Sequence, residues 1–317
     1  MWTSDRIRDL SLPMIAAPMF LASSVSSVVA AARSGIVGAI PALNARTTES
    51  FERVLVDIKE GLTAGPFAGV KAIGPYAINL VVHKSNARLE ADLDMIVKHR
   101  VPIVITSLGA VRNVVDKIHG YGGVVFHDVI STYHAQKALD AGVDGIIAVC
   151  AGAGGHAGTL NPFAFLHELR ALTDRTLILA GAISTGRHVA AAILAGADMV
   201  SVGTRFIATR ESPVPDAFKT MIVESHAGDI VYTPKISGVN ANFLTKSIAA
   251  AGISLETFEG HSALDMASEL SSGKAWRDIW SAGHGVGAIT DIPSIEELVR
   301  RMRAEYAQAV RELPHFD

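Results

Sequence analysis

The sequence predicts an α/β protein whose main domain is a closed (β/α)8 barrel. From Met14 to Phe206, short runs rich in Val, Ile and Ala alternate with Gly, Pro, Ser and Asn turns and with longer segments of helical spacing. This alternation is typical of parallel strands joined by helical crossovers. Several runs are apolar on both faces, as buried parallel strands are. The eight strand candidates are "MIAAPM" (14–19), "VGAIPA" (37–42), "YAINLVV" (76–82), "VPIVITSL" (101–108), "GVVFHDV" (123–129), "GIIAVCA" (145–151), "TLILAGAI" (176–183) and "MVSVGTRF" (199–206).

The first element could be mistaken for a targeting or membrane segment. Residues 12–32 are uncharged and follow two arginines, which is a pattern shared with signal peptides. Pro13, Pro18 and two pairs of serines interrupt this stretch, so we predict a short strand, a turn and an amphipathic helix. We therefore predict no membrane association and a cytoplasmic protein.

Several crossover segments end in residues that are typical of helix C-termini. Glycines follow several helical segments at positions 35, 142 and 196, as is common at helix C-termini. The final charged segment, "SIEELVRRMRAEYAQAVREL" (294–313), is long enough to be the last helix of the barrel. Eight strand and helix units favour a closed barrel over an open sheet, and chemistry in such barrels takes place on the loops after the strands.

The alternation stops after the eighth strand. Residues 213–287 combine a helical pattern, "SALDMASELSSGKAWRDIW", with an irregular segment, "YTPKISGVNANFL". We predict that they form a smaller, mostly helical domain over the barrel mouth. The barrel itself would consist of residues 1–212 and 288–317. An insert in this position would exclude water from a site at the mouth.

Composition narrows the range of functions. The chain has 317 residues, of which 49% are hydrophobic, and a net charge of -3. It contains no long run of Lys or Arg, so we predict a small-molecule substrate and no nucleic acid or membrane partner. A single cysteine, Cys150, excludes an internal disulfide and a cysteine-based zinc site, and we expect it to be a buried structural thiol. We predict no metal.

The stretch "CAGAGGHAGTLNP" (150–162) has three interpretations, and the first is a dinucleotide-binding fingerprint. Its G-x-G-x-x-A pattern begins at Gly152 and follows a predicted strand. In that fingerprint the helix starts within the glycine turn. Here Asn161 and Pro162 are predicted to be the cap and the first turn of the helix. The helix therefore starts too late for a Rossmann turn.

The second interpretation is a place where the backbone approaches a flat, phosphate-bearing cofactor. The segments "LAGAISTGRH" and "SVGTRF" place glycines after the seventh and eighth strands, where barrels commonly bind phosphate. The alternative is that Gly181 and Gly203 only ease tight turns.

The third interpretation is a loop with one histidine, His156, which would project into the barrel mouth. Its near-neutral pKa suits proton transfer or stabilisation of an anion.

Five segments together resemble the nitronate monooxygenases, formerly called 2-nitropropane dioxygenases. They are "PMIAAPMF", "INLVV", "AGAGGHAG", "LAGAISTGRHVAAAILAGADMVSVGTRFIATRES" and "IWSAGHGVGAI". The resemblance covers about Pro13 to Ile289. It implies a flavoprotein oxidoreductase with a TIM-barrel fold that uses FMN and O2 to oxidise alkyl nitronates to carbonyl compounds and nitrite. Related barrels include flavin-dependent enoyl-ACP reductases and NADH:quinone reductases.

The resemblance also implies roles for individual residues. His156 would be catalytic, stabilising an anionic nitronate or abstracting the α-proton of a neutral nitroalkane. The cofactor would be bound by Pro18, Met19 and Phe20 along the ring, Asn79 at its polar edge, Gly154 and Gly155 beside the histidine, Gly181, Ala182, Ile183, Gly203 and Thr204 at the phosphate, and Ser281 from the insert. Some relatives have a lysine near the flavin on strand five, where this chain has His127 and Asp128. We include His127 among the cofactor-binding residues.

Two other functions stay open at this stage. One is an NAD(P)H-dependent flavin reductase that acts on an enoyl thioester or a quinone. The other is a non-catalytic barrel that binds a phosphorylated ligand. Arg205 and Arg210 could attract an anion or form ion pairs. The physiological substrate, the use of NAD(P)H and the oligomeric state are left open, with a homodimer as one option.

Overall fold

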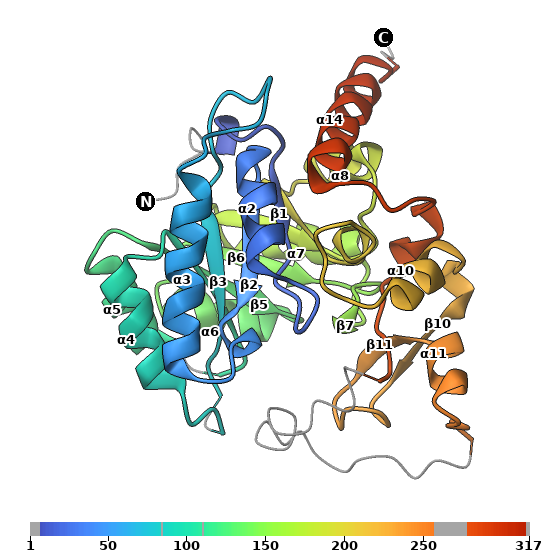
Figure 1. The fold of residues 1–317 in the computed structure, drawn as a ribbon, viewed down its shortest axis with the longest axis horizontal. Coiled ribbons are helices and arrows are strands. Elements are labelled where there is room, and N and C mark those ends of the chain that lie inside the picture. The colour runs from blue at the N-terminus through green and yellow to red at the C-terminus, as the bar shows by residue number, and fades with distance from the viewer. Residues whose placement is uncertain (1–6, 84, 110, 257–277, 315–317) are drawn as a thin grey trace.

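The computed structural model describes residues 7–83, 85–109, 111–256 and 278–314 (Figure 1). Eight parallel strands form a closed barrel, in which the first and the last strands pair with each other. Each strand lies within one of the predicted runs, so the predicted (β/α)8 barrel is confirmed. The strands are β1 (Met14–Ala16), β2 (Val37–Pro41), β3 (Tyr76–Val81), β4 (Ile103–Ser107), β5 (Val124–Val129), β6 (Gly145–Val149), β8 (Thr176–Ala180) and β9 (Met199–Val202).

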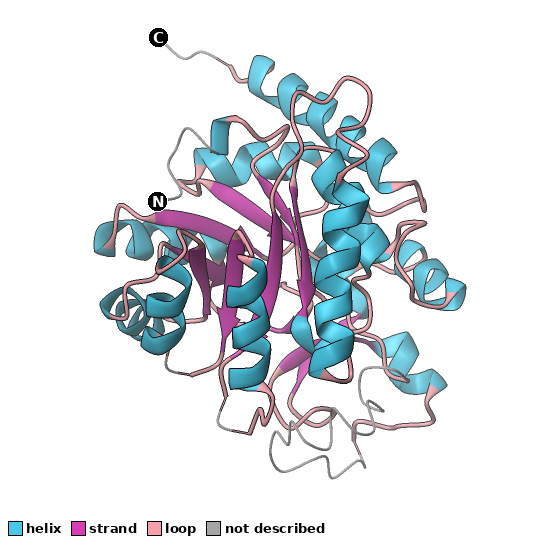
Figure 2. Ribbon diagram, turned by 60° about the vertical axis from the view of Figure 1, so that its left-hand side comes forward, coloured by secondary structure: helices cyan, strands magenta, loops and turns pink. Residues whose placement is uncertain are grey.

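Helices surround the barrel strands (Figure 2). They are α2 (Val25–Arg33), α3 (Thr48–Leu62), α4 (Leu89–His99), α5 (Arg112–His119), α6 (Thr132–Asp140), α7 (Pro162–Leu172), α8 (Gly186–Leu194) and α14 (Ile295–Arg311). Asn161 caps α7 and Pro162 opens it, which confirms the late helix start predicted for this loop. Gly35, Gly142 and Gly196 follow helices with positive φ angles of 79°, 95° and 102°. The predicted helix ends are therefore confirmed.

The barrel interior is filled by alternate residues of each strand, because successive side chains of a strand point to opposite faces. The inner core contains Ile15, Ala39, Ala77, Ile105, Phe126, Ile147, Ile178 and Met199. The intervening residues, such as Val104 and Val125, pack outward against the helices. This alternation decides which side chains reach the barrel mouth from inside.

A second, smaller sheet was not predicted. It is antiparallel and consists of β10 (Ile230–Thr233), β11 (Ala241–Leu244) and β7 (Gly155–His156). The same part of the chain contains α9 (Thr204–Ile207), α10 (Asp216–Val223), α11 (Thr245–Ala250) and the 3-10 helices η2 (Ala227–Asp229) and η3 (His284–Ala288). A further 3-10 helix, η1 (Ala42–Asn44), follows β2 and contacts β3 and α3. Most of the helical pattern predicted between residues 262 and 280 lies outside the described residues. The division at residues 213–287 stays a prediction.

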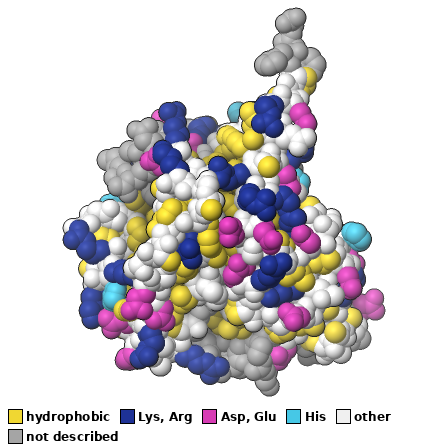
Figure 3. All heavy atoms as spheres, turned by 45° about the horizontal axis from the view of Figure 1, so that its top comes forward, with side chains coloured by type: hydrophobic (Ala, Val, Ile, Leu, Met, Phe, Trp, Pro, Cys, Tyr) yellow, Lys and Arg dark blue, Asp and Glu magenta, His cyan; other side chains and the backbone are white. Residues whose placement is uncertain are grey.

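The first segment contains the elements that the sequence predicts. On the face drawn in Figure 3, basic and acidic side chains are interspersed. Residues 12–32 contain β1, a turn and α2. Within the described ranges, no helix is both long enough and apolar enough to cross a bilayer.

Candidate active site

A cavity of about 1130 Å³ opens at the carboxyl ends of the barrel strands. This volume slightly exceeds the ~300–1,000 Å³ that is usual for ligand pockets. The floor of the cavity is formed by the next inward-facing residue of each barrel strand, two positions after a residue of the inner core. These floor residues are Ala17, Pro41, Asn79, Ser107, Asp128, Val149, Ala180 and Ser201. Most of these side chains are small, so the floor leaves room for a flat ligand. The cavity lies at the end where (β/α)8 barrels carry their active sites.

All residues that the sequence assigned to a site line this one cavity. They are Pro18, Met19, Phe20, Asn79, His127, Gly154, Gly155, His156, Gly181, Ala182, Ile183, Gly203, Thr204 and Ser281. Asn79 and His127 lie on the barrel strands β3 and β5, and the others come from the segments after barrel strands and from the segment that precedes η3. Their convergence on one cavity is a property of the fold.

The loop that carries His156 is held from two sides. Gly155 and His156 form β7, which pairs with β11. The backbone N–H of Gly155 donates to Ser281 Oγ at 2.6 Å. The Tyr232 hydroxyl, from β10, donates to the carbonyl oxygen of Ala157 at 2.9 Å. The backbone on either side of His156 is therefore fixed by β10, β11 and Ser281, which follow the eighth barrel strand in the chain.

The segment before η3 packs backbone to backbone against the same loop. The N–H of Gly283 donates to Thr204 Oγ1 at 2.9 Å, and the N–H of His284 donates to the Gly152 carbonyl at 2.9 Å. A Cβ atom at Gly283 would lie only 2.4 Å from the Gly152 oxygen. Only glycine permits this approach. The segment at residues 281–284 therefore holds the loop of the glycine motif in position.

His156 faces the cavity, and its side chain is exposed on that side. The protein around the ring nevertheless desolvates it, and this burial lowers the pKa of His156 below its ordinary value. Burial in a less polar environment disfavours the charged imidazolium. The ring is therefore neutral at pH 7 and can accept a proton.

Three polar side chains form a directed chain of hydrogen bonds on the floor. Asn79 Nδ2 donates to the Ile105 carbonyl at 3.1 Å and to Ser107 Oγ at 2.8 Å. Ser107 Oγ donates its only hydrogen to Asp128 Oδ2 at 2.6 Å. Since a carbonyl can only accept, the nitrogen of Asn79 must face Ile105. The group that Asn79 has left for a ligand is its acceptor, Oδ1.

His127 lies on the other face of β5 from Asp128. Its Nδ1 is 2.8 Å from Thr106 Oγ1, and Thr106 donates to the Phe126 carbonyl at 3.1 Å. His127 therefore donates from Nδ1 to Thr106. Burial, followed by the charge of His134, lowers the pKa of His127 to about 4. This neutral ring lines the cavity toward α6, outside the barrel floor.

Two loops form the end of the cavity that was predicted to bind phosphate. Gly181 and Ala182, after β8, have positive φ angles of 140° and 55°, and Gly203 precedes α9 after β9. Thr185 caps α8. The first N–H of this helix, at Gly186, donates to Glu305 Oε2 at 2.7 Å. The first N–H of α8 is therefore already occupied by the Glu305 carboxylate.

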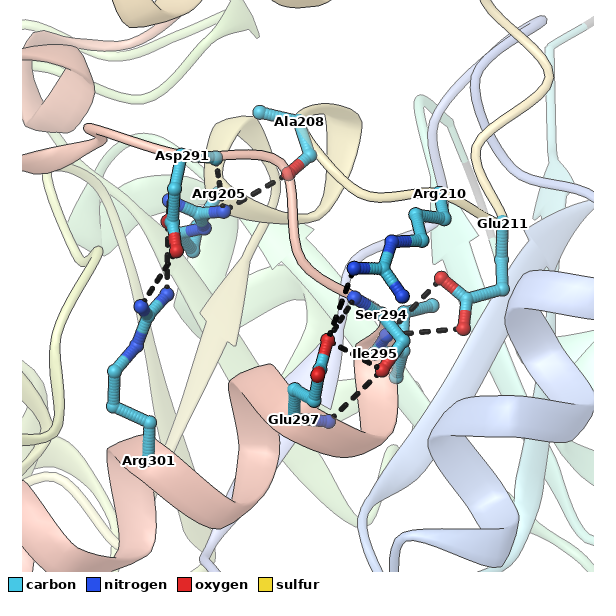
Figure 4. A network of polar contacts seen from close by, with 9 residues as sticks. All are labelled: Arg205, Ala208, Arg210, Glu211, Asp291, Ser294, Ile295, Glu297 and Arg301. Atoms are coloured by element: carbon cyan, nitrogen blue, oxygen red, sulfur yellow. Dashed lines mark hydrogen bonds and ion pairs between the residues drawn. The ribbon is translucent and has the colours of Figure 1, made fainter.

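Arg205 and Arg210 lie outside the residues that line the cavity. Arg205 is 2% exposed and donates to the carbonyl oxygens of Ala208 and Asp291 at 2.9 and 2.8 Å. In Figure 4, Arg205 and Arg301 both point toward the Asp291 carboxylate. Arg210 pairs with Glu297 at 3.7 Å. These arginines form ion pairs around the start of α14.

Removing the carboxylate from this network should destabilise the protein. We expect Asp291→Ala to lower the free energy of unfolding by about 2 kcal/mol, because Arg205 stays buried without its counter-charge. This figure is below the usual range for buried pairs since the Asp291 side chain is 42% exposed. Urea denaturation at pH 7 measures the change. Asp216→Ala, at a fully exposed carboxylate that is 4.0 Å from Lys219, is the control and should change little.

The ion pairs of Asp291 also predict how the stability of the protein changes at acid pH. Arg301, and then Arg205, hold the pKa of Asp291 below its ordinary value of 3.8. A carboxylate with a lowered folded pKa stabilises the fold above its unfolded pKa and loses this effect as the pH falls through the folded value. The difference between wild type and Asp291→Ala should therefore shrink below pH 3.8. An equal difference at pH 7 and in this acid range would contradict the assignment.

Cys150 is buried, and burial raises the pKa of its thiol to about 12. A thiol of this kind is protonated at neutral pH and is a poor nucleophile. The predicted burial of Cys150 is confirmed. Among the described residues, no cluster of three or more His, Cys, Asp or Glu could hold a metal ion.

Two residues of the site escaped the sequence interpretation. Ser107 links Asn79 to Asp128, and the alternation of strand 103–107 could have indicated it. Asn242 Nδ2 donates to the Ala153 carbonyl at 2.7 Å. Nothing near Asn242 in the sequence indicates this contact, because it depends on the pairing of β11 with a loop far away in the chain.

Two solved structures share the fold at low sequence identity. The structure of FabK from Thermotoga maritima is similar with a TM-score of 0.79 and 22% identity, covering 98% of this chain and 96% of that one. Nitroalkane oxidase from Streptomyces ansochromogenes is similar with a TM-score of 0.81 and 20% identity, covering 98% of this chain and all of that one. These likenesses establish the barrel fold.

Sequence comparison identifies the family. A nitronate monooxygenase from Neurospora crassa is 25% identical over 350 residues, which cover 96% of this chain and 91% of the relative. A (3aS,4S,5R,7aS)-5-hydroxy-7a-methyl-1-oxo-octahydro-1H-indene-4-carboxyl-CoA dehydrogenase from Rhodococcus jostii is 28% identical over 165 residues, and the chain spans 46% of the length of that relative. The family model described as nitronate monooxygenase matches residues 6–305. The chain therefore belongs to the nitronate monooxygenase family of flavin-dependent oxidoreductases.

Proposed function

We propose that the chain is an FMN-dependent nitronate monooxygenase, which oxidises alkyl nitronates with O2 to carbonyl compounds and nitrite. The observation that carries this proposal is the convergence of the family's motif residues on one cavity with His156 exposed to it. The substrate is a small molecule, an alkyl nitronate or the nitroalkane from which it forms. A homodimer and a cytoplasmic location stay predictions.

The residues around the cavity fit FMN. Small floor residues such as Ala17, Ala180 and Ser201 leave room for a planar ring. Asn79 offers an acceptor to an N–H of that ring. We assign the phosphate to the loops at Gly181, Ala182 and Ile183 and at Gly203 and Thr204. The volume of about 1130 Å³ leaves space for a substrate beside the cofactor.

The protein's own contribution is to position the substrate and to handle one proton. When bound, FMN supplies the redox chemistry. Neutral His156 can take the α-proton of a nitroalkane, and in its protonated form it can stabilise the nitronate anion. The segment around Ser281 and Tyr232 fixes the loop that presents this histidine. A base held rigidly at the substrate needs no reorganisation before proton transfer.

The visible spectrum of the purified protein is the first test. We expect a flavin spectrum and the release of FMN on denaturation. Mixing the protein with ethyl nitronate without oxygen should change the flavin absorbance rapidly, and admission of O2 should yield nitrite. NADH should react slowly in a parallel experiment.

The alternatives give different results in the same experiment. Rapid bleaching by NADH without a response to the nitronate would identify a flavin reductase. A colourless protein that takes up no added FMN would contradict both flavin functions, and would favour a barrel that binds another phosphorylated ligand.

A further inference from the structure

Asp128 is a carboxyl group on the cavity floor that the proposed reaction does not use. Its Oδ2 accepts the hydrogen of Ser107 at 2.6 Å. The described residues offer Oδ1 no hydrogen bond, and Asp128 lines the cavity. Oδ1 is therefore the atom at which this carboxyl can hold a proton or meet a ligand.

The hydrogen-bond chain determines which atoms of Asn79 and Asp128 face a ligand and whether each can donate or accept a hydrogen bond. Asn79 Oδ1 is an acceptor, because both hydrogens of Nδ2 are donated to Ile105 and Ser107. Asp128 Oδ1 is an acceptor when the group is ionised and a donor when it carries a proton. With the proton in place, the floor offers an acceptor on β3 and a donor on β5, the two strands that flank β4 and Ser107.

Among the described residues, no cation contributes to the pKa of Asp128. Burial raises its pKa to about 6, and the hydrogen bond from Ser107 opposes this only in part. The floor residues on the flanking strands β4 and β6, Ser107 and Val149, are uncharged, and so is Asn79 on β3. The titratable side chains that line the rest of the cavity are Arg112 on α5, His127 on β5, Tyr133, His134 and Lys137 on α6, His156 on β7 and Tyr232 on β10. None of these charges is among the causes of the shift.

We propose that Asp128 takes up a proton when FMN binds and donates it to a carbonyl oxygen of the isoalloxazine, while Asn79 accepts from the neighbouring ring N–H. This inference rests on the proposed function, since it requires FMN in this cavity. The pyrimidine edge of the ring presents an N–H between two carbonyl groups. A protonated Asp128, linked to Asn79 through Ser107, suits a carbonyl of that edge while Asn79 suits the N–H, whereas an ionised Asp128 would oppose a carbonyl oxygen.

The direction of the effect follows from solvation. A ring lying over the floor removes water from Asp128, and removal of water disfavours the ionised carboxylate further. Binding at neutral pH is then accompanied by proton uptake. By linkage, an equilibrium that takes up one proton weakens by up to about tenfold for each pH unit above the pKa of the free group. The affinity for FMN should therefore fall as the pH rises above about 6.

Asp128→Asn is the matched variant, because its side chain has the same shape, is neutral at every pH and keeps a donor. Calorimetric titration of the apoprotein with FMN in buffers of different ionisation enthalpy gives the number of protons taken up. At pH 7.5 we expect wild type to take up about 0.5–1 proton more than the variant. The phosphate of FMN also titrates near pH 6, but its contribution is common to both proteins.

A second measurement needs no variant. The infrared difference spectrum between FMN-bound and free wild type at pH 7.5 should gain the carbonyl stretch of a protonated carboxyl group, and Asp128→Asn should lack this band. Equal proton uptake in the two proteins, or the absence of the band in wild type, would overturn the inference while the proposed function stands. Failure of wild type to bind FMN would overturn both.

Discussion

Replacing His156 with Asn should reduce the turnover of a neutral nitroalkane by a factor of ~10²–10⁴, which is the usual contribution of a general base. Asn keeps a polar side chain of similar reach but cannot take a proton at neutral pH. The backbone contacts of the loop do not depend on the side chain at position 156. FMN should therefore remain bound, and nitrite release with nitroethane measures the loss.

The pH profile distinguishes a base from a packing role. Because burial lowers the pKa of His156, the neutral form predominates at pH 7 and above. With wild type and a neutral nitroalkane, kcat/KM should be constant there and fall at lower pH, as His156 becomes protonated. With the preformed nitronate, which has already lost its proton, the variant should lose much less activity.

His167→Asn is the control, because His167 is an exposed residue of α7 that does not line the cavity. It should turn over both substrates as wild type does. Undiminished turnover of nitroethane by His156→Asn would show that His156 is not the base. A variant without FMN would instead assign the residue to cofactor binding.

The barrel could be predicted because each of its strands carries a local signal. Runs such as residues 145–149 and 176–180 are apolar and buried, and turn residues bound them. The site could be predicted because barrels place the loops after their strands at one end. His156 and the glycines of its loop lie after one strand, and Gly181 and Gly203 lie after two others.

The orientation of the strand-five residues could not be predicted. The run 124–129 is largely apolar on both faces, so its composition does not show which residues point inward. The sequence interpretation placed His127 toward the cofactor. Both residues line the cavity, but Asp128 lies in the floor layer and His127 on the outer face of β5, where it bonds Thr106. A difference of one residue exchanges the two faces of a strand.

The small sheet could not be predicted from the sequence for a different reason. β7 has only two residues, Gly155 and His156, and without their partner they have the composition of a loop. Their strand character comes from pairing with β11, which lies more than 80 residues later in the chain. Local patterns contain no information about such a pairing.

Gly186→Ala should cause the largest loss of stability among these predictions. Gly186 is the first residue of α8, and α14 crosses directly above it. A Cβ atom at this position would lie 1.9 Å from the Met302 carbonyl oxygen and 2.6 Å from the Tyr306 nitrogen. Both are backbone atoms of a helix, so no side-chain rotation can relieve the overlap. Separation of the helices would also stretch the 2.7 Å hydrogen bond from the Gly186 N–H to Glu305.

We expect Gly186→Ala to lower the free energy of unfolding by about 3 kcal/mol, at the upper end of the usual range for overpacking. Urea denaturation with a constant m-value measures it. Helix propensity alone predicts the opposite sign, since alanine favours a helix over glycine by ~1 kcal/mol. Gly228→Ala, with no atom within 4 Å of the new Cβ, is the control and should change stability by at most about 0.5 kcal/mol. A stabilised Gly186→Ala variant would contradict the close packing of α8 against α14, and with it the closure of the barrel by the C-terminal helix.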